Sequence, residues 1–182
     1  MTESLRLFYA LWPDEATRKA LSLWQANISG RRVPSKNLHI TLAFLGEQPA
    51  SIVPELSRIL ESVSSHAIRL KLDKTGYFSH HRICWTGMEQ IPEHLIQLHD
   101  ELVSALLEKA VSFDRYSRFT PHITLARHSG RARMASPPPI IWNANHLVLV
   151  KSHFTQSKKG NHHQYTPIAE RILNDQIAPS FP

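Results

Sequence analysis

The sequence contains little cysteine and little glycine. Cys84 is the only cysteine, which excludes a disulfide bond within the chain and is typical of proteins that work in a reducing cytoplasm. The six glycines form neither a P-loop nor a GxGxxG turn, the loops that hold nucleoside triphosphates and dinucleotides. The sequence therefore argues against both of these nucleotide-binding folds.

The common metal and serine-nucleophile motifs are also missing. The chain has no HExxH segment, no paired CxxC and no GxSxG, so neither a zinc site nor a serine hydrolase is expected. His94 and His99 are spaced so that they fall on different faces of a helix. We therefore expect no metal and no other cofactor.

Long apolar runs are absent as well. No stretch reaches the roughly 18 apolar residues of a membrane-spanning helix. The segment 1–6 lacks the basic stretch and following apolar stretch of a signal peptide. We expect a cytoplasmic protein without membrane contact.

The composition is that of a globular protein with an excess of positive charge. Of the 182 residues, 42% are hydrophobic and 20% are charged, which suits one compact domain with a sizeable core. The net charge is +6 and the sequence pI is about 9.7. A basic surface attracts polyanions, among which nucleic acid is the commonest.

One short pattern, His-apolar-Thr-apolar, occurs twice, once in each half of the chain. The two copies are LHITLAF at 38–44 and PHITLAR at 121–127. Side chains alternate faces along a β-strand, so His39 and Thr41 share one face while their neighbours share the other. The same holds for His122 and Thr124. The apolar face belongs in a core, and the His/Thr face is expected in a polar cleft.

Two such pairs can carry out acid–base chemistry on a phosphodiester without a metal. A neutral imidazole accepts a proton near pH 7 and an imidazolium donates one, so His39 and His122 can divide the two proton transfers between them. The hydroxyls of Thr41 and Thr124 can donate hydrogen bonds to phosphate oxygens as negative charge develops there.

Two further residues occupy matching positions, each five residues after its histidine. Arg127 suits a phosphate or a base edge, and Phe44 can stack on a nucleobase. The odd offset places both on the opposite face of an ideal strand, so they reach the cleft only if the strand bends, bulges or ends. The alternatives are a solvated surface charge for Arg127 and core packing for Phe44.

The periodicity predicts strands and helices in two similar halves. Strands are expected at 5–12, 38–45, 68–72, 82–88, 121–127, 146–152 and 165–172. Helices are expected from Asp14 to about Gly30, from Ser51 to Val63, and from Pro92 to about Ala110. Turns or loops are expected at 73–81, 129–139 and 155–163. Each half contains a helix followed by its own His-apolar-Thr strand, which indicates a diverged duplication.

With both motifs placed, the chain resembles the 2H phosphoesterase superfamily, and within it the bacterial RNA 2′,3′-cyclic phosphodiesterases, also called 2′-5′ RNA ligases. The resemblance rests on the two HxT motifs and extends over nearly the whole chain. The segments that carry it are 6–10, 37–46, 121–127 and 165–168. Relatives often have arginines just before the last of these, where this chain has Lys158, Lys159, His162 and His163.

The resemblance implies a fold and a reaction. The fold is α+β and bilobed, with an antiparallel-rich sheet and helices in each lobe and the active-site cleft between the lobes. Residues 1–182 would form a single 2H phosphoesterase domain of two pseudo-symmetric lobes, with strand exchange between the lobes as an option. The reaction is metal-independent hydrolysis of RNA 2′,3′-cyclic phosphate ends to 2′-phosphate, with RNA ends or cyclic nucleotides as substrates of a monomer.

The resemblance also assigns roles. His39 and His122 match the catalytic pair, and Thr41 and Thr124 match the phosphate-contacting pair. Arg127 and Phe44 match positions associated with phosphate and base contact. We favour His39 as the acid and His122 as the base, an order that the sequence itself leaves open.

Two alternatives share the same site. The first is a 2′-5′ RNA ligase acting on tRNA halves, which runs the same chemistry in reverse. The second is an RNA- or nucleotide-binding module that keeps the scaffold without turnover, as the basic charge allows.

Overall fold

A computed structural model describes residues 3–64, 66–130, 138–157 and 160–174, without the side chains of residues 154–162. Most of the predicted loop at 129–139 lies outside the described residues, as do Lys158 and Lys159. Within the described ranges, no helix combines the length and the apolarity needed to cross a membrane.

The structure contains ten strands and three α-helices within these ranges. The strands are β1 (Ser4–Leu11), β2 (Arg31–Arg32), β3 (Ile40–Pro49), β4 (Ile68–Leu72), β5 (Lys74–Phe78), β6 (Ile83–Gly87), β7 (Ile123–Arg127), β8 (Ile140–Ala144), β9 (His146–Ser157) and β10 (Gly160–Ile172). The helices are α1 (Glu15–Gln25), α2 (Val53–Ser62) and α3 (Glu93–Glu108), with 3-10 turns at Ser35–Asn37 and Ala50–Ile52.

Most elements agree with the predicted pattern, and the exceptions have local causes. The Asp14 side chain accepts a hydrogen bond of 2.7 Å from the backbone N–H of Thr17 and so caps α1, as expected. The predicted turn at 73–81 is wrong in its first part, because Lys74–Phe78 forms β5 against β6. β5 is half-buried along its whole length and therefore lacks the alternation that marks a strand in sequence.

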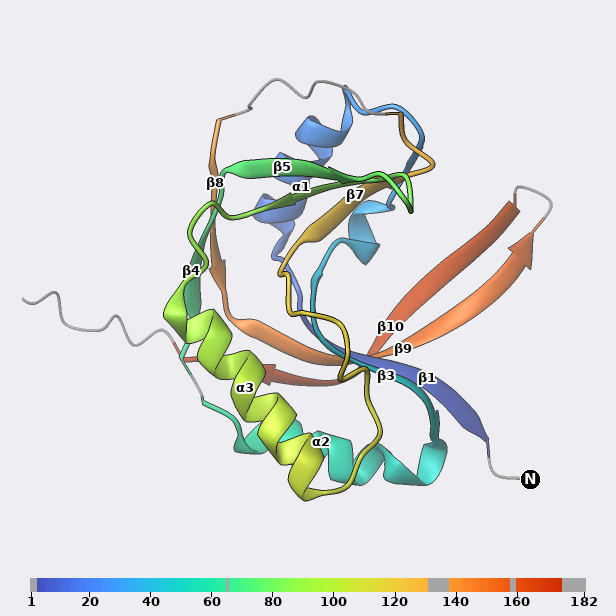
Figure 1. Cartoon of the computed structure of the whole chain (residues 1–182), viewed down its shortest axis with the longest axis vertical. Coiled ribbons are helices and arrows are strands. Elements are labelled where there is room, and N and C mark those ends of the chain that lie inside the picture. The colour runs from blue at the N-terminus through green and yellow to red at the C-terminus, as the bar shows by residue number, and fades with distance from the viewer. Residues whose placement is uncertain (1–2, 65, 131–137, 158–159, 175–182) are drawn as a thin grey trace, which may run out of the picture.

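The predicted turn at 155–163 is also wrong, because the described residues of this segment belong to strands β9 and β10. β9 and β10 run on as a hairpin, with Gly160 paired to Ser157. This hairpin projects beyond the sheet, away from α2 and α3 (Figure 1).

The strands form one large antiparallel sheet and one small one. The large sheet has the order β10-β9-β1-β3-β7-β6-β5, with β2 paired to β7, while β4 and β8 pair separately. Helices α2 and α3 contact each other; α2 packs on β9 and β10, and α3 on β3, whereas α1 packs on β8 and β7. The α+β class with mainly antiparallel sheet is thus confirmed.

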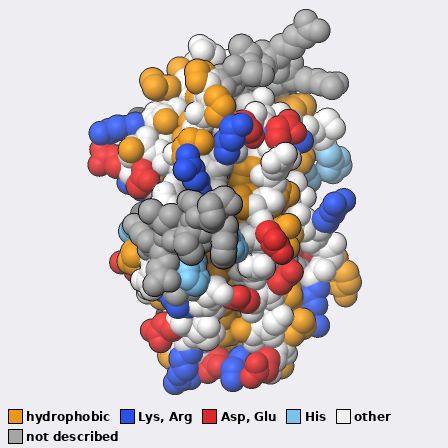
Figure 2. All heavy atoms as spheres, turned by 90° about the vertical axis from the view of Figure 1, so that its left-hand side faces the viewer, with side chains coloured by type: hydrophobic (Ala, Val, Ile, Leu, Met, Phe, Trp, Pro, Cys, Tyr) orange, Lys and Arg blue, Asp and Glu red, His pale blue; other side chains and the backbone are white. Residues whose placement is uncertain are grey.

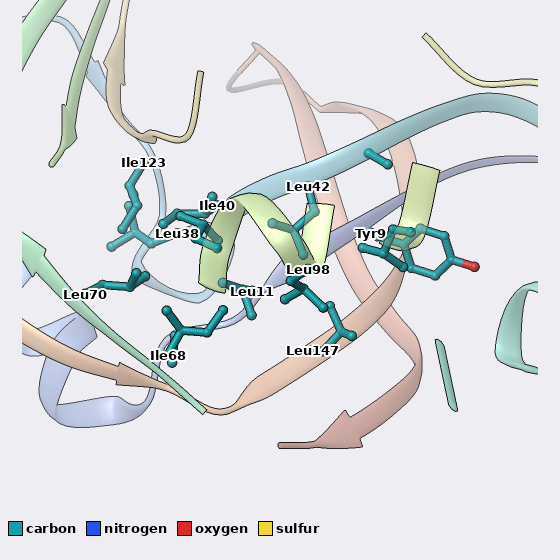
Figure 3. Packing of buried hydrophobic residues seen from close by; sticks show 14 of the residues in the cluster. Tyr9, Leu11, Leu38, Ile40, Leu42, Ile68, Leu70, Leu98, Ile123 and Leu147 are labelled. Carbon is teal, nitrogen blue, oxygen red and sulfur yellow. The ribbon is translucent and has the colours of Figure 1, made fainter. Parts of the chain in front are cut away.

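The main core is an apolar cluster that spans both halves of the chain, and Phe8, Ala10, Val148 and Val150 form a smaller second cluster. The predicted inward residues of both motifs belong to the main core, because Leu38, Ile40, Leu42, Ile123 and Leu125 are all buried. Figure 3 shows Leu38, Ile40 and Ile123 packed together where β3 meets β7.

The two halves are joined at a point of approximate symmetry. β3 and β7 pair through one register position, at which Ile40 lies opposite Ile123. Next to this pair, Ala10 of β1 lies opposite Thr41, and Trp85 of β6 lies opposite Thr124. The β1–β3 pair and the β7–β6 pair therefore have corresponding registers on either side of the Ile40–Ile123 pair. Each of them includes the threonine of one HxT motif.

Candidate active site

A cleft of about 930 Å³ lies over the junction of β3 and β7 and holds all six residues expected in the site. Its lining includes His39, Thr41, Phe44, His122, Thr124 and Arg127. It also includes five cationic side chains, from Arg6, Arg31, Arg32, Lys36 and Arg127, and no carboxylate among the described residues. The cleft is therefore positively charged in a protein whose surface elsewhere mixes both signs, as the face in Figure 2 shows.

His39 is held in one orientation by its own chain. Its Nδ1 lies 2.7 Å from the carbonyl oxygen of Asn37, and since a carbonyl only accepts, Nδ1 donates. In the neutral ring the proton is thus on Nδ1, and Nε2 is an acceptor. The Thr41 hydroxyl lies 3.1 Å from Nε2 and donates to it.

His122 repeats this arrangement. Its Nδ1 donates to the carbonyl oxygen of Thr120 at 2.7 Å, two residues upstream as in the first copy. Its Nε2 is likewise left as the acceptor in the neutral ring. Within the described part of the chain, the hydrogen bond from Thr41 to His39 has no counterpart between Thr124 and His122, so the two imidazoles differ at Nε2.

Asn37 links this geometry to the projecting hairpin. Its backbone carbonyl accepts from His39, while its side-chain Nδ2 donates to the carbonyl oxygen of His163 at 2.9 Å. Asn37 is itself buried. The orientation of His39 is therefore coupled to the position of β10.

Aromatic side chains enclose both imidazoles. Trp12 stacks on His39 with ring centroids 5.4 Å apart, and Phe8 and Tyr165 lie at 5.0 and 5.2 Å. On the other side, Phe78 lies 5.1 Å from the ring of His122, and Trp85 lies 6.2 Å from it.

The sequence prediction missed these five aromatic residues. Phe8 of β1 and Trp12, which directly follows β1, are four residues apart, and this even spacing was a usable signal. Their position beside His39 depends on the order of the strands in the sheet, which a local sequence pattern does not predict.

The enclosure changes how the histidines titrate. Burial lowers the pKa of His39 to about 4, opposed by its hydrogen bond to Asn37 and assisted by the charges of His122 and Arg127. Burial also lowers the pKa of His122, again with a contribution from Arg127. Both rings are therefore neutral near pH 7 in the absence of an anion, in the tautomer that leaves Nε2 as the acceptor.

Matching β-bulges turn Phe44 and Arg127 into the cleft. In β3, Ala10 lies opposite Thr41 but Tyr9 lies opposite Ala43, so Leu42 is an extra residue. In β7, Trp85 lies opposite Thr124 but Cys84 lies opposite Ala126, so Leu125 is extra. Each bulge places two consecutive residues in the core and returns the next one to the His/Thr face.

Phe44 and Arg127 each lie five residues after their histidine, an odd number that would place them on the opposite face of an ideal strand. The bulges reverse this at the same position in both halves, and both side chains therefore line the cleft. Arg127 is close enough to influence the pKa of His39, His122 and His163. The guanidinium of Arg6 lies over the ring of Phe44, 4.9 Å from its centroid.

The basic residues of the cleft come mainly from segments that carried no motif. Arg31 of β2 lies directly opposite Arg127 of β7. Like charges at facing strand positions are unfavourable by themselves, and an anion between them would relieve the repulsion.

Other histidines lie partly in the site. His81, His128 and His163 also line the cleft. No group of three or more His, Cys, Asp or Glu side chains in the described ranges is arranged to hold a metal ion.

The fold and the cleft together define a class of protein. Two oriented imidazoles, two hydroxyls and a cation-lined cavity on an antiparallel sheet are the parts of a site for an anionic phosphate ester. The family model of the 2′-5′ RNA ligase superfamily matches residues 12–154, and the chain belongs to this superfamily. The resemblance stated from the HxT motifs is thus confirmed.

Known relatives cover most of the chain. The RNA 2′,3′-cyclic phosphodiesterase of Escherichia coli is 34% identical over 95% of this chain and 99% of its own length. The protein of the same name from Thermus thermophilus is 33% identical over 81% of this chain and 82% of its own. The crystal structure of E. coli LigT complexed with 3′-AMP superposes with a TM-score of 0.81 at 32% identity, covering 95% of this chain and all 100% of that one.

Proposed function

We propose that this protein hydrolyses the 2′,3′-cyclic phosphate at the end of an RNA to a 2′-phosphate, with His39 and His122 as general acid and base and without a metal. The observation that carries the proposal is the paired tethering of the two rings. Each Nδ1 is bonded to a backbone carbonyl, which leaves both Nε2 atoms for substrate in one cationic cleft. The names of the two curated relatives supply the substrate class.

The reaction transfers one proton at each histidine. His122 accepts a proton at Nε2 from the attacking water, whose oxygen forms a bond to phosphorus. The bond from phosphorus to the 3′ oxygen breaks, and His39 donates the Nε2 proton of its imidazolium form to that oxygen. We favour this order because Nε2 of His122 makes no hydrogen bond to its threonine in the described structure, whereas Nε2 of His39 does.

The acid must be charged before it can act. Burial lowers the pKa of His39 to about 4, so the ring is mostly neutral at pH 7. A cyclic phosphate is an anion, and an anion beside an imidazole stabilises its protonated form. Substrate binding is therefore expected to raise the pKa of His39 and to supply the proton that the leaving oxygen needs.

The remaining site residues bind the substrate. The hydroxyls of Thr41 and Thr124 and the guanidinium of Arg127 donate to the phosphate oxygens, and their bonds strengthen as charge develops there. Phe44 lines the same cleft and stacks on the terminal base. The existence of a complex of E. coli LigT with 3′-AMP supports nucleotide binding by this chain.

We also propose that residues 1–182 act as one domain of two pseudo-symmetric lobes, as a monomer in the cytoplasm. The shared core and the Ile40–Ile123 junction support the first part. The use of a single cysteine is compatible with a reducing compartment.

The second candidate is formation of 2′-5′ linkages between RNA pieces such as tRNA halves. The description of the superfamily favours it, and the chemistry is the same reaction with a 5′-hydroxyl in place of water. A binding module without turnover is less well supported, because both HxT pairs are intact and correctly tethered.

Product analysis separates these functions. The protein is incubated in EDTA with a 2′,3′-cyclic mononucleotide and with a short RNA ending in a 2′,3′-cyclic phosphate, with and without a second RNA bearing a 5′-hydroxyl. Formation of 2′-phosphate ends supports the proposal, and a 2′-5′ joined product supports the ligase. Binding with no product, or turnover only after metal is added, would contradict the proposed metal-independent hydrolysis.

A further inference from the structure

A second hollow adjoins the cleft. It has a volume of about 500 Å³ and shares three lining residues with the cleft, namely Arg6, Ser152 and His163. The two cavities are therefore neighbouring parts of one groove, and Arg6 lies at their boundary.

The floor of both parts is the same face of the large sheet. On β1, Phe8, Arg6 and Ser4 follow one another on this face at steps of roughly 7 Å. Arg6 lies opposite Ser152 of β9 and opposite Glu47 of β3, so the three side chains form a row across the sheet. One such step along the strands is comparable with one nucleotide of an extended RNA strand.

The character of this face changes at Arg6. Towards His39 it is aromatic, with Phe8 and Tyr165 in contact at 5.2 Å between ring centroids. Beyond Arg6 it is polar, with the Ser4 hydroxyl donating to the carboxylate of Glu47 at 2.8 Å. A carboxylate oxygen and a serine oxygen accept hydrogen bonds from the hydroxyl and amino groups of a nucleoside.

Arg6 has the features of a phosphate ligand. Its side chain is exposed and its guanidinium is placed by the ring of Phe44. Among the described residues, none of the ion pairs involves Arg6. A fixed guanidinium without a carboxylate partner binds a phosphate diester through paired N–H donors.

We propose that the second hollow binds the nucleoside that precedes the cyclic-phosphate nucleotide, and that Arg6 binds the phosphodiester joining the two. This inference rests on the proposed function, because it takes the terminal phosphate to lie between His39 and His122. It makes the protein selective for RNA ends over free cyclic nucleotides, through contacts one nucleotide away from the reacting phosphorus.

Binding of product analogues tests the subsite independently of turnover. The dissociation constant is measured for a mononucleoside 2′-phosphate and for a dinucleotide with the same terminal 2′-phosphate. The wild-type protein is expected to bind the dinucleotide at least about 10-fold more tightly, as one charge-assisted hydrogen-bond pair would provide. In Arg6→Ala this preference is expected to fall to about twofold or less.

Two further variants sharpen the comparison. Glu47→Ala removes an acceptor that lines the second hollow but not the cleft. This variant is expected to weaken binding of the dinucleotide more than binding of the mononucleoside 2′-phosphate. Arg58→Ala removes an arginine from α2, where it pairs with Glu55 at 2.7 Å and lies outside both cavities. Arg58→Ala is expected to keep the full preference.

The outcomes separate the two proposals. Equal affinity of the wild-type protein for both analogues would overturn the subsite, as would an equal loss for both in Arg6→Ala. If the preference and its dependence on Arg6 are found in a protein that hydrolyses no cyclic phosphate, the subsite stands and the proposed function fails. If the protein hydrolyses a cyclic phosphate but binds the two analogues equally well, the proposed function stands and the subsite fails.

Discussion

Ile40 of β3 lies directly opposite Ile123 of β7, and this pair is the register position that joins the two halves of the sheet. Each isoleucine follows a site histidine in sequence, and both are fully buried. The pair therefore fixes the relative position of His39 and His122, which are brought together from distant parts of the chain.

Shortening one of these side chains should affect catalysis as well as stability. Ile123→Ala removes buried methyl groups at the junction and is expected to cost about 2–4 kcal/mol of unfolding free energy. It should also lower kcat, because the two imidazoles lose their common support. Ile59→Ala, at a similarly buried position on α2, should destabilise the protein comparably while kcat is kept. Urea denaturation and steady-state kinetics measure both effects, and an unchanged kcat in Ile123→Ala would count against the role of the junction.

The desolvation of the half-buried His39 ring predicts a pH-dependent stability. Its pKa is lowered to about 4 in the folded protein from about 6.5 in the unfolded chain. Between these values the unfolded chain binds more protons, so the free energy of unfolding falls as the pH is lowered through this window. The expected contribution is a loss of about 2 kcal/mol at pH 5 relative to pH 7.5.

The variant His39→Gln isolates this contribution. It should lack that part of the pH dependence, since glutamine does not titrate, while the other histidines titrate as before. Urea unfolding curves at the two pH values provide the measurement. Identical pH dependence in both proteins would show that His39 is not desolvated as described.

Arg127 is expected to control both charge and phosphate affinity. Its positive charge lowers the pKa of His39 and His122, so Arg127→Gln should raise both towards the ordinary value. Arg127→Lys keeps the charge but loses the planar fork, so it should leave the pKa values low and still weaken phosphate binding, by about 10-fold. Proton NMR titration of the imidazole resonances and phosphate binding test these effects separately, and pKa values that do not move in Arg127→Gln would refute the first.

Gly76 supports the second imidazole through the ring of Trp85. A Cβ at position 76 would lie 2.1 Å from Cζ2 of Trp85, and this ring neighbours His122. Gly76→Ala should therefore displace Trp85, cost about 1–3 kcal/mol and reduce kcat. Gly130→Ala is the matched control, because its Cβ would meet only Oγ of Ser29 at 3.6 Å. Thermal unfolding and kinetics of the two variants should differ clearly, and similar behaviour would exclude this support.

The sequence predicted the parts of this structure that depend on local periodicity. The buried faces of both HxT strands follow from alternation, and the cap at Asp14 follows from helix chemistry. Arg127 and Phe44 could be named but not placed, since a bulge is set by the register of the neighbouring strand. Arg6 gave no signal, and the spacing of Trp12 did not place it, because the proximity of both residues to the site depends on β1 lying beside β3.

The central claim is that two histidines from separate halves act on one phosphate. The most direct test is the rate of hydrolysis of a 2′,3′-cyclic phosphate end in EDTA for His39→Ala and His122→Ala, with folding verified by circular dichroism. The account predicts that each variant alone loses about 10²- to 10⁴-fold in kcat and that the double variant loses little more, since the pair acts as a unit. Full activity in either single variant would contradict it.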